Sequence, residues 1–129
     1  MNGRVLLDTS MVIALFAGDP GVRRGLAEAS EVFVPSIVLG ELYYGARKSA
    51  RVRENLARIE EFATANVVLG CDAETARQYG RIKRDLQAKG RPLPENDIWI
   101  SAVAKQYELT LASRDDHFAE IEGLSMEKW

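Results

Sequence analysis

The chain has 129 residues, 47% of them hydrophobic and 28% charged, with a formal net charge of −2, which predicts a single globular domain over residues 1–129. The near-neutral charge excludes binding of nucleic acid through an overall basic surface, so such a contact needs a local patch. The single cysteine excludes an internal disulfide, no apolar run approaches the roughly 18 residues of a membrane span, and without a signal-peptide pattern we expect a cytoplasmic protein.

In the first half of the chain, short apolar runs alternate with segments of helical periodicity. RVLL is a continuous apolar run that stops at a turn-forming acid, and EVFVP is apolar and β-branched, so both are typical of buried strands. In chain order this half predicts a strand at 4–7, helices at 10–17 and 20–29, a strand at 31–35, and helices at 36–48 and 50–64, with Ser36 as candidate N-cap of the helix at 36–48.

The second half continues the alternation. NVVLG and LTLAS read as strands, and a proline-containing loop at 90–96 separates two helices. The predicted elements are a strand at 66–70, helices at 73–88 and 95–107, a strand at 109–113 and a candidate fifth strand at 124–126. Strands that alternate with helices predict an α/β fold, a three-layer α/β/α arrangement around a central parallel sheet of four to five strands.

Two aspartates follow predicted strands. In open parallel sheets, functional groups gather beyond the carboxyl ends of the strands. Asp8 directly follows the first strand, and Asp115 follows the fourth after a short turn. Because an aspartate after a strand is also a good helix N-cap, capping is an alternative interpretation for each of them.

Two further acids lie on predicted helices. Glu41 is on an apolar helix face, where a carboxylate is costly to bury unless a cation or a donor compensates it. The alternatives are a partner arginine or a side chain that reaches the surface. Asp97 opens the helix ENDIWISAVAKQY, where an acid is also favoured by the helix dipole alone.

Taken together, these carboxylates would repel one another unless they were protonated or shared a cation. Mg²⁺ or Mn²⁺ with oxygen ligands resolves that conflict, and such an ion activates water against a phosphodiester. The sequence has no glycine-rich phosphate loop and no zinc-type set of ligands. Its one histidine, His117, has no thiol or serine arrangement to serve, and we interpret it as a surface or structural residue.

Four segments, LLDTSMVIALF, PSIVLGELYYGA, PENDIWISAVA and LASRDDHF, resemble the four acidic motifs of PIN-domain ribonucleases. The size and the spacing are most similar to VapC-type toxins of bacterial VapBC toxin–antitoxin pairs. By position, Asp8, Glu41, Asp97 and Asp115 match the four acids. The neighbouring residues that the resemblance marks as supporting are Thr9, Ser113, which stands where the family usually has threonine, and Asp116, which competes with Asp115 for the fourth position.

The resemblance implies a metal-dependent endoribonuclease that cleaves RNA by metal-activated water and acts as the toxin of a type II toxin–antitoxin system. Asp8, Asp97 and Asp115 would hold Mg²⁺ or Mn²⁺, and Glu41 would position a water or a second ion. The implied partners are an RNA substrate and a VapB-type antitoxin, in a homodimer or a toxin–antitoxin hetero-oligomer, with no membrane.

Two basic clusters are candidates for RNA contact, and they include Arg47 and Lys48 in one and Lys83 and Arg84 in the other. Their alternative interpretation is a solvated helix face. For the whole chain, one alternative is a catalytically silent PIN-like module that binds RNA or protein. Another is a phosphatase with Asp8 as nucleophile, which is disfavoured because Ser10 stands where such enzymes commonly have an acid.

Overall fold

The computed structural model describes residues 3–129. Its centre is a sheet of five parallel strands in the order β3-β2-β1-β4-β5. Each predicted strand run is present, which confirms the parallel α/β interpretation. The strands are β1 (Arg4–Leu7), β2 (Glu31–Pro35), β3 (Val67–Leu69), β4 (Thr110–Ala112) and β5 (Met126–Glu127).

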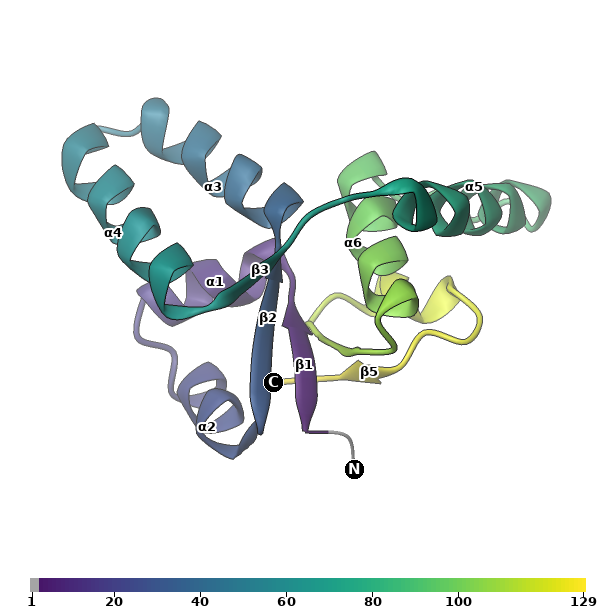
Figure 1. Ribbon diagram of the computed structural model, residues 1–129, viewed down its shortest axis with the longest axis horizontal. Helices are drawn as coiled ribbons and strands as arrows, with labels where there is room; N and C mark the ends of the chain where they lie inside the picture. Colours follow the sequence, from purple (N-terminus) through teal and green to yellow (C-terminus); the bar gives the residue numbers. More distant parts are fainter. Residues whose placement is uncertain (1–2) are drawn as a thin grey trace.

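Helices flank this sheet. In Figure 1, α1 to α4 lie to the left of β1 and β2, while α5 and α6 lie to the right, so the fold has three layers. The helices are α1 (Thr9–Phe16), α2 (Pro20–Glu28), α3 (Ser36–Arg47), α4 (Val52–Ala65), α5 (Ala73–Ala88) and α6 (Glu95–Gln106), followed by a short 3-10 helix, η1 (Asp116–Glu120). Among these helices, none is long and apolar enough to span a bilayer in the described residues.

Two local predictions were wrong, and one element was not predicted. Ser36 is the first residue of α3 rather than its N-cap; Pro35 occupies the cap position and provides no side-chain hydrogen bond. The fifth strand is at Met126–Glu127 instead of 124–126, because Met126 pairs with Leu111 of β4. The segment Asp116–Glu120, which had no predicted structure, forms η1.

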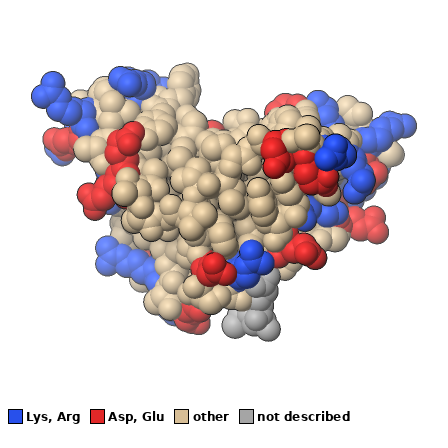
Figure 2. All heavy atoms as spheres, viewed as in Figure 1, with Lys and Arg blue, Asp and Glu red and all other residues tan. Residues whose placement is uncertain are grey.

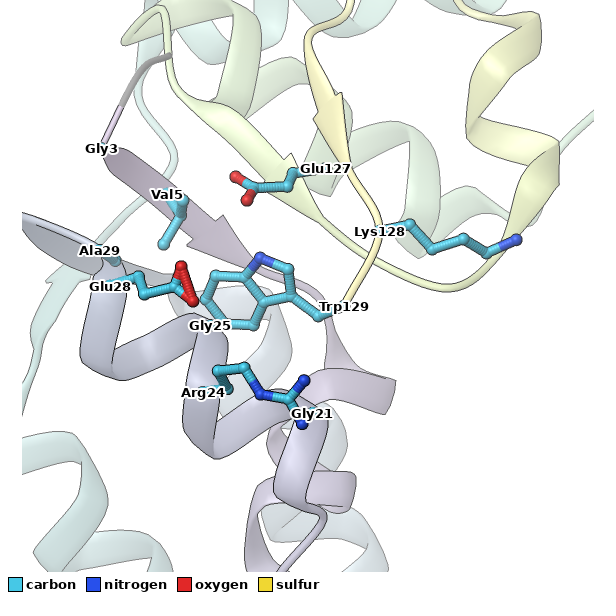
Figure 3. A pocket seen from close by; sticks show the side chains of 10 residues that line it. All are labelled: Gly3, Val5, Gly21, Arg24, Gly25, Glu28, Ala29, Glu127, Lys128 and Trp129. Atoms are coloured by element: carbon cyan, nitrogen blue, oxygen red, sulfur yellow. The ribbon is translucent and has the colours of Figure 1, made fainter.

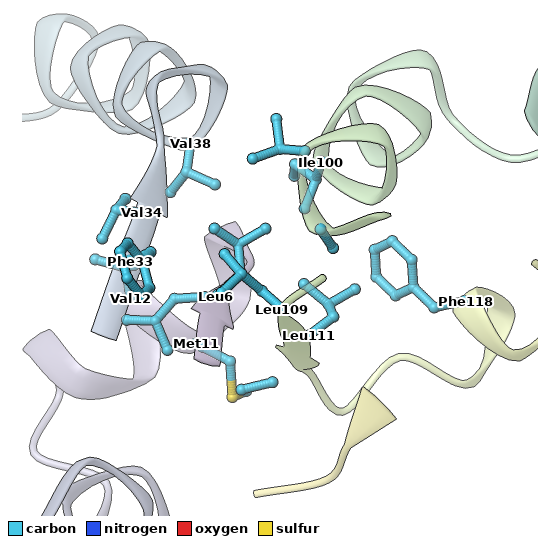
Figure 4. Close-up of a cluster of buried hydrophobic side chains, with 14 of the residues drawn as sticks. Leu6, Met11, Val12, Phe33, Val34, Val38, Ile100, Leu109, Leu111 and Phe118 are labelled. Atoms are coloured by element: carbon cyan, nitrogen blue, oxygen red, sulfur yellow. The ribbon is translucent and has the colours of Figure 1, made fainter. Parts of the chain in front are cut away.

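The core consists of the strand residues and of the helix faces that pack on them. Leu6 of β1 and Leu111 of β4 are fully buried at the centre of the sheet. Figure 4 shows them between side chains of α1, α3 and α6. Burying an aliphatic side chain of this kind stabilises the fold by about 1.5–3 kcal/mol, so these two strands contribute strongly to the core.

β1 is also the strand at which the strand order of the sheet changes direction. Its neighbour on one side is β2 and on the other β4, which follows β1 about one hundred residues later in the sequence. A crevice outside the carboxyl ends of the strands forms at such a switch point and is the usual place for ligands. We therefore expect functional residues directly after β1 and β4.

An ion pair ties α2 to the segment after β4. Asp19 caps α2 by accepting from the backbone N–H groups of Gly21 and Val22, at 2.9 and 3.1 Å. The same carboxylate accepts two hydrogen bonds from the guanidinium of Arg114, at 2.8 and 2.9 Å. Arg114 immediately precedes Asp115, so this pair fixes the backbone that presents the fourth acid.

We predict that Asp19→Asn makes the protein less stable at pH 7 and that the difference becomes smaller as the pH falls from 3.8 toward 2. The hydrogen bond from Arg114, followed by that from the Val22 N–H, holds the pKa of Asp19 far below its ordinary value of 3.8. A lowered pKa in the folded state stabilises the protein above pH 3.8, and that contribution is lost as the pH falls toward the folded-state value. Asparagine still caps the helix, so only the ion pair is removed.

The measurement is the thermal midpoint of both proteins between pH 2 and pH 7. Asp116→Asn serves as the control, because Asp116 forms an ion pair with Lys128 in which its side chain is 90% exposed, and exposed pairs contribute little. If the thermal midpoints of the two variants depend on pH in the same way, the Asp19–Arg114 pair does not stabilise the fold.

Candidate active site

The four acids singled out in the sequence come together at one edge of the sheet. Asp8 follows β1, and Asp115 follows β4, the strand that pairs with β1. Glu41 lies in α3, and Asp97 lies in the first turn of α6. Asp97 interacts electrostatically with the other three carboxylates, which shows that all four face a common region.

Asp8 is the most deeply buried of these residues, with 4% of its surface exposed. Its Oδ1 atom accepts hydrogen bonds from the Met11 N–H at 3.0 Å and from the Ser10 hydroxyl at 2.9 Å. Its Oδ2 atom accepts from the Ser113 hydroxyl at 2.5 Å. Asp8 thus caps α1, as its alternative interpretation predicted, and still belongs to the acidic cluster.

Hydroxyl groups hold two of the other acids. Thr9 donates to Glu41 Oε1 at 2.6 Å, so the compensating donor for this half-buried glutamate is a hydroxyl. Ser113 donates to Asp8 and accepts from the Asp115 N–H at 3.0 Å. This buried serine therefore connects the acid after β1 with the acid after β4.

His117 is the site residue that the sequence interpretation missed. Its Nδ1 atom lies 2.9 Å from Asp115 Oδ1, and its Nε2 atom lies 3.0 Å from Asp97 Oδ2. The imidazole is brought there by the tight turn after β4, in which Asp115 Oδ1 accepts from the His117 N–H and caps η1. The usable signal was the spacing Asp-x-His directly after a strand.

The electrostatics of the cluster are unfavourable for a full set of charged carboxylates. The pKa of Asp97 is raised, chiefly because burial disfavours its charged form. His117 opposes this shift, and the negative charges of Glu41, Asp115 and Asp8 add to it. The fold holds like charges together at a cost that a cation would remove.

The donor set fits a divalent metal ion. Ligand atoms of Asp97, Asp115 and His117 all lie within 4.8 Å of one another, and the buried Asp8 lies close enough to interact with Asp97. Carboxylate oxygens suit Mg²⁺ and Mn²⁺, and an imidazole nitrogen is acceptable to Mn²⁺. The repulsion within the cluster and its oxygen-rich composition are the observations that favour such an ion.

Other candidate residues lie elsewhere. Asp116 pairs with Lys128 at 3.1 Å, and only Asp115 joins the cluster. Lys83 is already engaged by Glu95 at 3.0 Å, whereas Arg47, Lys48 and Arg84 are exposed. On the face in Figure 2, Lys and Arg gather at the two outer ends, over the α3–α4 pair and over α5, and the middle is largely uncharged.

A pocket of about 250 Å³ lies between the beginning of β1, α2 and the residues after β5, and it contains none of the four acids. Figure 3 shows the indole of Trp129 against Gly25 in this pocket. A Cβ atom at position 25 would lie 2.3 Å from the indole, so only glycine allows this close approach. We interpret this pocket as the packing site of Trp129.

The amino-acid sequence of the chain is similar to those of known proteins. Residues 5–124 match the model of the PIN domain. The chain is 35% identical to ribonuclease VapC2 of Haemophilus influenzae and 32% identical to the tRNA(fMet)-specific endonuclease VapC of Shigella flexneri, in each case over 98% of both chains.

Solved structures of similar fold include VapBC complexes. The DNA-bound VapBC structure from Salmonella typhimurium has a chain that superposes with a TM-score of 0.90 at 31% identity, covering 100% of this chain and 99% of that one. A chain of VapBC2 from Rickettsia felis, bound to a promoter DNA fragment, superposes with a TM-score of 0.89 at 26% identity, covering 97% and 98%.

We predict that Ser113→Ala destabilises the metal-free protein by about 1–3 kcal/mol, because a buried Asp8 oxygen and the part-buried Asp115 N–H both lose their partner. Ser10→Ala is the matched control, since it removes a hydroxyl from the same carboxylate at an exposed position, where changes stay within about 0.5 kcal/mol. Urea unfolding at neutral pH gives both values. Similar losses in the two variants would contradict the connecting role of Ser113.

Proposed function

Because the chain belongs to the PIN-domain family, and within it to the VapC ribonucleases, we propose that it is a metal-dependent endoribonuclease acting as the toxin of a type II toxin–antitoxin system. The observation that supports this most strongly is the convergence of Asp8, Glu41, Asp97 and Asp115 on one edge of the sheet. We place the activity in the cytoplasm, where RNA is available and the exposed Cys71 remains reduced.

In this proposal Asp8, Asp97 and Asp115 hold Mg²⁺ or Mn²⁺. When bound, such an ion lowers the pKa of a coordinated water and neutralises charge on the phosphodiester that is attacked. Glu41, whose Oε1 is fixed by Thr9, orients the attacking water through its remaining acceptor sites. Asp8 is kept rigid by its three hydrogen bonds, so the ligand position needs little reorganisation.

The substrate proposal is RNA, since several relatives of this chain are named as ribonucleases and two as endonucleases specific for tRNA(fMet). Arg47, Lys48 and Arg84 are exposed and remain candidates for phosphate contacts. Lys83 is a weaker candidate because its ammonium group is paired with Glu95 and lies near the Tyr79 ring.

We also propose a VapB-type antitoxin as partner, because the similar structures are VapBC complexes. An apolar groove of about 260 Å³ between α1, α3 and α4 suits a segment of such a protein. Ile13, Leu42 and Glu41 are among the residues that line it, and Ile13 is 56% exposed. An arginine of the antitoxin would find an acceptor in the acidic cluster. A homodimer or a toxin–antitoxin hetero-oligomer is the expected assembly.

We predict that Asp8→Asn reduces RNA cleavage by more than about 100-fold. Removal of a residue that only supports a metal ligand costs up to about 100-fold, and the loss of a ligand itself should cost more. Asparagine keeps an oxygen for the cap of α1, so the loss reports on the site and not on folding. The measurement is cleavage of total RNA by purified, antitoxin-free protein with Mn²⁺ and with chelator, together with growth after induced expression.

Asp116→Asn is the matched control in the same experiment, because its carboxylate pairs with Lys128 outside the cluster, and it should cleave RNA and arrest growth like the wild type. Full toxicity of Asp8→Asn would overturn the proposed site. A wild-type protein that binds no Mn²⁺ in calorimetric titration and cleaves no RNA would instead be a catalytically silent binding module.

A further inference from the structure

The position of His117 within the acidic cluster suggests a specific division of roles, which rests on the metal site proposed above. The imidazole lies between two carboxylates, with one ring nitrogen facing each of them. The two contacts differ in kind. Asp115 Oδ1 lies 2.9 Å from Nδ1 and also accepts from the backbone N–H of the same histidine, so it holds this residue at two points.

The Nε2 atom is in a different situation. It is buried and has no hydrogen-bond partner, although Asp97 Oδ2 is only 3.0 Å away. A neutral imidazole has one N–H and one lone pair, and an ionised carboxylate only accepts. With the N–H on Nδ1 facing Asp115, Nε2 presents its lone pair to the same space as the oxygen of Asp97.

Two lone pairs that meet in a buried space are the arrangement a metal ion satisfies. Histidines that ligate a metal almost always donate the other ring N–H to a carboxylate, which fixes the ring and raises its basicity. Here Asp115 is placed to be that carboxylate. Its side chain is also the more exposed of the two acids, at 48% against 24% for Asp97.

We therefore propose a refinement of the ligand set given above: Nε2 of His117, instead of the Asp115 carboxylate, is the metal ligand beside Asp97 and Asp8. Asp115 is then a positioning residue that orients the imidazole through Nδ1. The ligand set then contains a nitrogen atom in addition to carboxylate oxygens. Nitrogen donors increase affinity along the series from Mn²⁺ to Co²⁺, whereas Mg²⁺ binds through oxygen. The site consequently prefers Mn²⁺ and Co²⁺ to Mg²⁺, and His117 is the source of that preference.

The test is calorimetric titration of metal-free, antitoxin-free protein with Mn²⁺, Co²⁺ and Mg²⁺. His117→Ala should weaken Mn²⁺ and Co²⁺ binding by at least about 10- to 100-fold, because that loss is already seen when a residue that supports a metal ligand is removed. The affinity for Mg²⁺ should change much less. The visible absorption spectrum of bound Co²⁺ should also differ between His117→Ala and the wild type, because the spectrum reports on its ligands.

Substitutions at position 115 separate the two roles of the acid. If Asp115 orients His117, Asp115→Asn keeps an oxygen that accepts from Nδ1–H and should bind Mn²⁺ better than Asp115→Ala, which loses about 10- to 100-fold. If Asp115 is itself an anionic ligand, both variants lose the same amount and the proposal is wrong. Asp116→Asn is the control, and thermal midpoints verify that each variant is folded.

The remaining outcomes are distinguishable. Wild-type protein that binds no Mn²⁺ would overturn the proposed function and this inference with it. Wild-type protein that binds Mn²⁺ as tightly as His117→Ala would overturn the inference alone. Tighter binding by His117→Ala would also overturn it, because the imidazole would then act as a cation that competes for the same carboxylates.

Discussion

Mutual repulsion of carboxylates at the edge between β1 and β4 is the constraint around which this molecule is arranged. Burial is the main cause of the raised pKa of Asp97, and the negative charges of Glu41, Asp115 and Asp8 raise it further. The fold withstands this repulsion because the backbone positions are fixed from outside the cluster. Parallel pairing of two buried strands sets the places of Asp8 and Asp115, and helices that pack on the same sheet set those of Glu41 and Asp97.

The polar residues next to these acids restrain them without neutralising them. Thr9 and Ser113 are uncharged, so their hydroxyls direct individual oxygen atoms while the negative potential remains. Arg114, the cation nearest in sequence to Asp115, is turned to Asp19 at the start of α2. A metal site benefits from this separation, since an arginine inside the cluster would satisfy the carboxylates that the ion needs.

The sequence was sufficient for much of this arrangement. Continuous apolar runs identified the strands because strands buried on both faces have no alternation, and four ordered acidic motifs indicated the PIN-domain family, which the comparisons confirm. Ser36 was misplaced because a serine after a proline looks like a cap, although Pro35 already ends the strand. Met126–Glu127 is too short to produce a periodic signal of its own.

His117 was missed for a different reason. Its role depends on the turn that follows β4, where Asp115 caps η1 and thereby brings the imidazole back toward α6. No periodicity describes such a turn, and a lone histidine on a polar segment is usually a surface residue. The structure therefore adds the direction of the His117 side chain, which the motif does not contain. It shows a cluster of four acids with one nitrogen donor beside them.

Asp8 illustrates why structural and functional interpretations of one residue need not compete. Its Oδ1 atom accepts from the Met11 N–H and the Ser10 hydroxyl, whereas Oδ2 accepts one hydrogen bond, from Ser113, and has a second lone pair for another partner. The cap also has a functional consequence, because the donated hydrogen bonds fix the carboxylate where a cation would bind. A strand end that begins a helix with an aspartate is thus already half of a ligand site, and the neighbouring strand supplies the rest.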